Sequence, residues 1–234
     1  MNKLTFEEIK PLFEEIKPLL DSNLNKPFPE IFTEEELDDV VKNKGKSGIL
    51  LEKAIGLLPD SSFLPDLKDM EIKTNSGRES IAISLISSHI DEIMNGISFK
   101  DSWIYTKINR FLYIYVDKSK DYKQWEYKHY RIIDINEITN LYERLESEFN
   151  YIIKQIIQLV NSGKQLTTIN GDNSSAAYFQ IRTKDSRGGN GFYHPIKYKG
   201  NRISDKNYAF YFRNLFVRQV IETNFFEGIF GGSS

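Results

Sequence analysis

Four charged residues early in the chain have the types and the spacing of a metal-dependent hydrolytic site. Asp66 follows a proline in the segment PDLKDMEIKT, and Glu71 and Lys73 stand two residues apart where apolar and charged residues alternate. Such alternation is typical of a β-strand, in which residues i and i+2 project from the same face about 6 to 7 Å apart. Glu52 lies upstream in Ser47–Leu58, a segment with helical spacing. Charged groups among apolar residues are costly to bury unless they are paired or hold an ion.

These side chains together predict phosphodiester hydrolysis. Converging carboxylates supply the oxygen ligands that Mg²⁺ prefers, and a bound divalent ion lowers the pKa of its water while a cation stabilises the developing charge. We therefore expect Glu52, Asp66, Glu71 and Lys73 to be catalytic. The first three are the predicted metal ligands, and Mg²⁺, for which Mn²⁺ should substitute, is the expected cofactor. The alternative is a solvated strand face carrying E-x-K, with Glu52 as a surface carboxylate of its helix.

Strand-like and helix-like segments follow one another along the chain and predict an α/β (α+β) fold. The expected strands are the DMEIKT segment, Ser80–Ser87, Arg110–Lys118 and Ala176–Lys184, and the expected helices are Glu137–Lys164 and Ala209–Thr223. No low-complexity linker divides them. We expect an acidic helical arm over 1–40, a catalytic lobe over 41–160 and a basic DNA-reading lobe over 161–234, as closely joined lobes of one domain.

The arm contains a tandem duplication, FEEIKPLFEEIKPL, with Pro11 and Pro18 at equivalent positions. Proline inside a helix removes a hydrogen-bond donor and clashes with the preceding turn. Each repeat therefore predicts a short helical turn that ends at its proline.

Composition excludes several classes of site and indicates a polyanionic partner. The chain has no cysteine and three histidines without metal-ligand spacing, so disulfides, thiolate nucleophiles and His- or Cys-built zinc sites are not expected. No apolar run reaches the roughly 20 residues that span a bilayer, and we expect a bacterial cytoplasmic protein. Residues 175–220 contain nine Lys and Arg against two Asp. This basic segment favours nucleic-acid binding, and the alternative is an ordinary solvated surface.

Six segments, in this order, resemble the MutH-type endonucleases, a family of mismatch-repair nicking enzymes and of restriction enzymes that cut at GATC. The segments are KGKSGILLE, LPDLKDMEIKT, TKINRFLYIYVDK, LYERLESEFNYII, YFQIRTK and YAFYFRNLF. The resemblance covers nearly the whole chain beyond the arm. It implies a PD-(D/E)xK fold, a mixed sheet flanked by helices, with a DNA cleft between two lobes and Mg²⁺ at the four charged residues.

The resemblance also implies residues that contact DNA. Lys44 and Lys107 would face phosphates, Arg182 and Lys184 would read bases, and Tyr211 corresponds loosely to a position that senses adenine methylation. Arg187, in the loop DSRGGNG, and Arg213 complete the predicted DNA-binding set, although this loop is also compatible with a simple hairpin tip. The chain departs from the family in the short spacing between Asp66 and Glu71 and in Thr183, where the family often has proline.

The leading hypothesis is a type II restriction endonuclease acting on double-stranded DNA at a short, GATC-like site. Such an enzyme would act as a homodimer on DNA, because a palindrome needs two active sites, and would accompany a cognate methyltransferase. Three alternatives stay open: a methyl-directed repair nickase, a DNA-binding protein without catalysis, and a partner-binding protein acting through its acidic arm.

Overall fold

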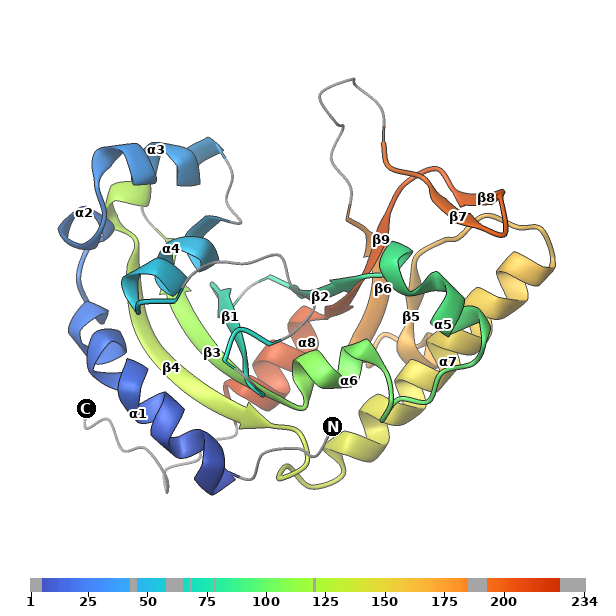
Figure 1. Cartoon of the computed structure of the whole chain (residues 1–234), viewed down its shortest axis with the longest axis horizontal. Helices are drawn as coiled ribbons and strands as arrows, with labels where there is room; N and C mark the ends of the chain where they lie inside the picture. The colour runs from blue at the N-terminus through green and yellow to red at the C-terminus, as the bar shows by residue number, and fades with distance from the viewer. Residues whose placement is uncertain are drawn as a thin grey trace. The chain divides into compact units, whose positions relative to one another are not determined.

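Strand pairing between distant segments divides the chain into two units, each with its own sheet and helices (Figure 1). The computed structural model describes residues 6–42, 46–57, 65–67, 69–77, 79–119, 121–184 and 193–223. Unit 1 contains the described residues up to 77 and 109–134, and unit 2 contains 79–108 and 135–223. The predicted mixed α+β class, with sheets flanked by helices, is confirmed.

The two units differ from the sequential lobes predicted over 41–160 and 161–234. The chain enters each unit twice, because β1 (Glu71–Asn75) pairs with β3 (Arg110–Asp117), whereas β2 (Ile81–Leu85), which lies between them, pairs with the late strand β9 (Tyr208–Phe212). The predicted DNA cleft stays a prediction.

Unit 1 is built on a three-stranded sheet with the order β1-β3-β4, in which β4 is Glu126–Asp134. β1 runs parallel to β3 and β3 antiparallel to β4. One face of the sheet is apolar and packs against the four N-terminal helices. These are α1 (Phe6–Asn23), α2 (Phe28–Ile31), α3 (Glu34–Lys42) and α4 (Lys46–Ala54), and the shared core includes Phe13, Phe28, Leu51, Met70, Ile72, Leu112 and Ile114.

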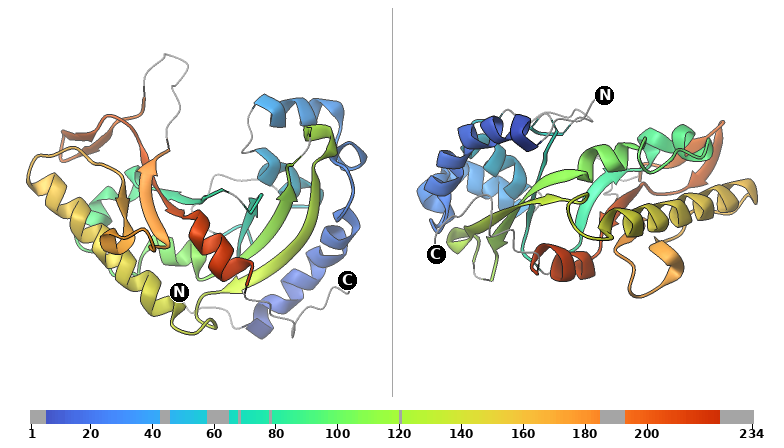
Figure 2. Two further views of the ribbon diagram at one scale, coloured as in Figure 1. Left: turned by 180° about the vertical axis from the view of Figure 1, so that it is seen from behind. Right: turned by 90° about the horizontal axis from the view of Figure 1, so that it is seen from below.

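The N-terminal segment is part of the unit 1 core. A single helix, α1, passes through both Pro11 and Pro18, so the prediction of turns ending at each proline was wrong. Burial of an apolar stripe, Phe13, Ile16 and Leu20, outweighs the lost helical hydrogen bonds. The helix lies along β4 in Figures 1 and 2, and its end is fixed there because the Tyr130 hydroxyl donates to Asp21 Oδ1 at 2.7 Å.

Unit 2 is built on an antiparallel sheet with the order β2-β9-β6-β5, in which β6 is Phe179–Thr183 and β5 is Ile169–Asn170. The long helix α7 (Leu141–Asn161) packs on one face of the sheet (Figure 2). The rings of Phe149 and Phe210 stack there with their centroids 5.7 Å apart. Unit 2 also contains α5 (Ile90–Met94), α6 (Trp103–Ile108) and the hairpin β7 (Ile196–Tyr198) and β8 (Asn201–Ser204). Its short helices are η1 (Ser87–His89), η3 (Gly171–Asn173), α8 (Asn214–Phe216) and η4 (Val217–Ile221).

Most of the expected elements are present, with one error at the end of the chain. The helix predicted over Glu137–Lys164 corresponds to α7, and Gly163 follows it in a left-handed conformation (φ 68°). The helix predicted over Ala209–Thr223 was wrong in its first part. Tyr208–Phe212 is the inner strand β9, all of whose residues are buried, and helical structure begins only at Asn214.

Candidate active site

Strand β1 brings Glu71 and Lys73 together on one face of the unit 1 sheet. Lys73 Nζ lies 2.5 Å from Glu71 Oε1, and the side chains are 20% and 4% exposed. The neighbouring Met70 and Ile72 are buried in the core on the opposite face, as the alternating sequence predicted. Because the Glu71 carboxylate is buried, the lysine ammonium group offsets its cost of desolvation.

Asp66 is held at the beginning of the same strand. Its Oδ2 accepts a hydrogen bond of 2.7 Å from the backbone N–H of Ile72, the residue between Glu71 and Lys73. A tight turn brings it there, because Leu67 and Met70 exchange backbone hydrogen bonds of 2.9 and 2.7 Å. The short spacing between Asp66 and Glu71 is therefore accommodated by this turn. The Asp66 carboxylate is exposed and lies beside the backbone that carries the ion pair.

Glu52 lies on α4, a helix that packs close to β1. A Cβ atom on Gly48, one turn before Glu52, would lie 3.5 Å from Thr74 Oγ1 of β1, so Gly48 and Glu52 share the side of α4 that faces this strand. Glu52 itself is half-buried. Within the described ranges, no group of three or more Asp, Glu or His side chains is arranged to hold a metal ion. The role of Glu52 as a metal ligand stays a prediction.

The ion-pair face of the unit 1 sheet continues across β3 to β4. Lys73 is in register with Tyr113, and Tyr113 with Arg131, so the two cations lie on strands about 9 to 10 Å apart. Next to Arg131, the ring of His129 stacks on Tyr115 with centroids 5.0 Å apart. Burial, together with the positive charge of Arg131, holds the pKa of His129 below its ordinary value. This row was not among the predicted site residues, because β4 was not among the expected strands.

The predicted DNA-contacting residues of unit 2 have different surroundings. Arg182 is exposed on β6, and its guanidinium carbon lies 4.3 Å from the ring centre of Tyr211 on β9. Burial raises the pKa of Tyr211, and Arg182 opposes this shift. The side chain of Lys184 is exposed, and Lys107 is half-buried at the end of α6. Lys44 and Arg187 lie outside the described residues.

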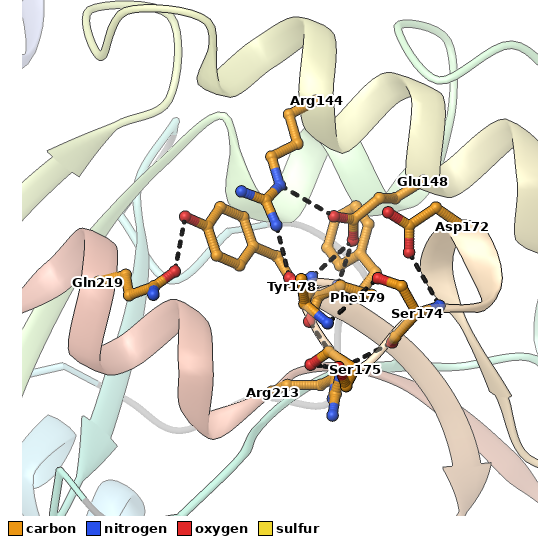
Figure 3. A network of polar contacts seen from close by, with 11 residues as sticks. Arg144, Glu148, Asp172, Ser174, Ser175, Tyr178, Phe179, Arg213 and Gln219 are labelled. Carbon is orange, nitrogen blue, oxygen red and sulfur yellow. Dashed lines mark hydrogen bonds and ion pairs between the residues drawn. The ribbon is translucent and has the colours of Figure 1, made fainter.

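Arg213 has a structural role that the sequence did not indicate. Its Nη1 donates to the carbonyl oxygens of Ser174, Ser175 and Ala177 at 3.3, 2.9 and 3.0 Å (Figure 3). These bonds hold the segment that leads into β6. Contact between Arg213 and DNA stays a prediction.

A buried carboxylate, Glu148 on α7, fixes the beginning of the same strand. Glu148 Oε2 accepts from the backbone N–H groups of Tyr178 and Phe179 at 2.8 and 2.6 Å, and Oε1 accepts from Arg144 Nε at 3.1 Å (Figure 3). The Arg144 guanidinium also covers the Tyr178 ring at 3.5 Å. The i, i+4 spacing of Arg144 and Glu148 was visible in the sequence and indicates a helical ion pair. The sequence did not indicate that the Glu148 carboxylate points inward toward β6.

A packing constraint accompanies this network. Gly171 lies so close to Glu148 that an added Cβ atom would be 2.6 Å from both Cβ and Oε2 of Glu148. Only glycine fits at this position without displacing the carboxylate from its partners.

Comparisons with known proteins give similarity to solved structures alone. No protein-family model and no curated protein matches the chain. A solved structure titled "Restriction endonuclease MvaI-cognate DNA substrate complex" is similar to it with a TM-score of 0.44 and 12% sequence identity, over 92% of this chain and 96% of that chain.

No helix in the described ranges is both long and apolar enough to span a lipid bilayer.

Proposed function

We propose that this protein is a Mg²⁺-dependent, sequence-specific DNA endonuclease of the type II restriction class. The observation that carries the proposal is the arrangement at β1, where the buried Glu71 is paired with Lys73 and Asp66 is hydrogen-bonded to the residue between them. Two carboxylates beside an ammonium group can hold a divalent metal ion and stabilise the negative charge that develops during phosphodiester hydrolysis. The collinear MutH-type segments of the sequence support the same activity.

The donor chemistry at β1 fits Mg²⁺. This ion is bound in many phosphoryl-transfer sites by one or two carboxylates, with water and substrate phosphate completing its shell. Asp66 and Glu71 would supply the two carboxylates, and Glu52 would support them from α4. When bound, Mg²⁺ would polarise the phosphate and make its water more acidic.

The residues of the chain would divide the remaining tasks between them. Lys73 would stabilise the negative charge that grows on the phosphate during in-line attack by water, and Glu71 would hold the lysine in position. By the MutH-type resemblance, the products would carry a 5′-phosphate and a 3′-hydroxyl. Arg182 and Lys184, both exposed on or beside β6, support a DNA-reading role for unit 2.

The restriction-enzyme hypothesis predicts two further partners. A palindromic, GATC-like target would require a homodimer on DNA, and a cognate methyltransferase would protect the host genome. The repair nickase is the competing form of the same chemistry, and it would cut one strand.

A plasmid assay tests the proposal. Supercoiled DNA with unmethylated, hemimethylated or fully methylated GATC sites is incubated with the protein and Mg²⁺, with Mn²⁺, or with EDTA. We expect linear fragments with discrete ends in either metal and none in EDTA. Open circles alone would indicate the nickase, and intact plasmid under all conditions would refute the endonuclease.

A further inference from the structure

One face of the unit 2 sheet presents a row of polar side chains opposite the helices. In the strand register, Ala82 of β2 pairs with Tyr211 of β9, Tyr211 with Gln180 of β6, and Gln180 with Asn170 of β5. Residues paired in this way point to the same side of a sheet. Arg182, two residues after Gln180, belongs to the same face.

The opposite face of this sheet is closed by the helical layer. Phe179 and Phe210 alternate with the polar residues along β6 and β9. The Phe179 ring lies 6.3 Å from the ring of Phe99, and the Phe210 ring lies 5.7 Å from the ring of Phe149, centroid to centroid. Ile181 is fully buried on that side. The polar face is more open, since Asn170 and Gln180 are half-buried and Arg182 is exposed.

The side-chain amides of Asn170 and Gln180 do not stabilise the fold through hydrogen bonds within the described part of the chain. Neither the Asn170 nor the Gln180 side chain makes a hydrogen bond there, although Asn170 immediately precedes the short helix η3 (Gly171–Asn173), where asparagine often caps a helix. Both residues are half-buried and their amide atoms remain accessible. They are therefore available to a ligand that offers both a donor and an acceptor.

From this geometry, and resting on the proposed DNA endonuclease, we infer that Gln180 and Asn170 read adenine while Arg182 reads a neighbouring guanine. Asparagine and glutamine form bidentate hydrogen bonds with N6 and N7 of adenine, and arginine with O6 and N7 of guanine. β5 is an edge strand of the sheet and pairs with β6, and side chains on strands can read base edges in the major groove. The Tyr211 ring, 4.3 Å from Arg182, holds the guanidinium next to the amides.

A binding selection tests this inference separately from cleavage. The full chain is incubated with a pool of randomised DNA duplexes in Ca²⁺, in which we expect binding without hydrolysis, and the bound sequences are compared among variants. We expect the wild type to enrich a motif with at least one A·T and one G·C pair. Gln180→Ala and Asn170→Ala should lower the preference for an A·T pair about 10-fold and leave the G·C preference unchanged.

A change of specificity distinguishes base reading from damage to the fold. Glutamate accepts a hydrogen bond from N4 of cytosine, so Gln180→Glu should move the preference at that position from A·T toward C·G. Gln158→Ala is the matched control, because Gln158 is an exposed amide on α7. This variant should enrich the wild-type motif.

Each other outcome overturns the inference. If the Asn170 and Gln180 variants enrich the wild-type motif, the amides do not read bases, while the endonuclease stands if the plasmid is cut. If the wild type enriches no motif, base reading by Asn170, Gln180 and Arg182 is refuted, and the result of the plasmid assay does not change this conclusion. A uniform loss of affinity across all sequences would likewise exclude base reading.

Discussion

The ammonium nitrogen of Lys73 lies 2.5 Å from a carboxylate oxygen of Glu71, and only 4% of the glutamate side chain is exposed. A buried carboxylate that loses its partner becomes an unpaired buried charge. This ion pair therefore contributes to stability as well as to the proposed chemistry, and a pair of substitutions separates the two.

Lys73→Met should abolish cleavage and lower the free energy of unfolding by about 3 kcal/mol, because the buried Glu71 carboxylate loses its ion pair with Lys73. The double variant Glu71→Gln/Lys73→Met should recover most of that stability, since the buried negative charge is gone, but it should recover no activity. Urea unfolding and the plasmid assay measure the two effects. Full cleavage by Lys73→Met, or a double variant as unstable as the single one, would contradict this account.

Asp66→Asn should remove activity without unfolding the protein. The amide oxygen of asparagine can still accept from the Ile72 N–H group, whereas the negative charge for Mg²⁺ is lost. We expect the cleavage rate to fall about 100-fold or more and DNA binding in Ca²⁺ to persist. Asp69→Asn, in the same turn, is the matched control and should cut normally; equal rates for the two variants would remove Asp66 from the site.

Gly171→Ala should destabilise unit 2. The new Cβ atom would lie 2.6 Å from Glu148 Cβ and Oε2, which forces the carboxylate away from the Tyr178 and Phe179 N–H groups and costs about 1 to 3 kcal/mol or more. Gly48→Ala is the control, because among the described residues the nearest atom to its Cβ would be Thr74 Oγ1 at 3.5 Å, and alanine is favoured in a helix by about 1 kcal/mol. Urea denaturation of both variants measures the difference, and an equally stable Gly171→Ala protein would refute the packing constraint.

His129 should make stability depend on pH. Burial and then Arg131 lower its pKa from the ordinary value of 6.5, so below pH 6.5 the unfolded chain binds more protons at this residue than the folded one. Its contribution to stability should therefore decrease as the pH falls through 6.5 toward the folded-state pKa. Arg131→Gln should raise the pKa of His129 but leave it below 6.5, because burial remains.

NMR titration of the histidine ring signals measures this change. The wild-type protein, measured over the same pH range, is the reference. An unchanged His129 titration in Arg131→Gln would show that the arginine charge does not act on the ring.

The sequence by itself determined the local features of the candidate site. Glu71 and Lys73 share a face because side chains alternate along any strand, and Met70 and Ile72 enter the core for the same reason. The apolar period of α7 and the glycine after it likewise fix the existence and the end of that helix. These features depend on residues a few positions apart.

Contacts between distant residues decided the rest. YAFYF became the inner strand β9 because β2 and β6 pair with both of its edges, and an unbroken apolar run does not distinguish a buried strand from a helix. Similarly, α1 continues through two prolines because its apolar stripe packs into the unit 1 core, and Glu148 reaches backbone N–H groups thirty residues away in the chain. The free energy of such contacts comes from burial and pairing between segments far apart in sequence, so local patterns do not encode them, and only the tertiary structure reveals them.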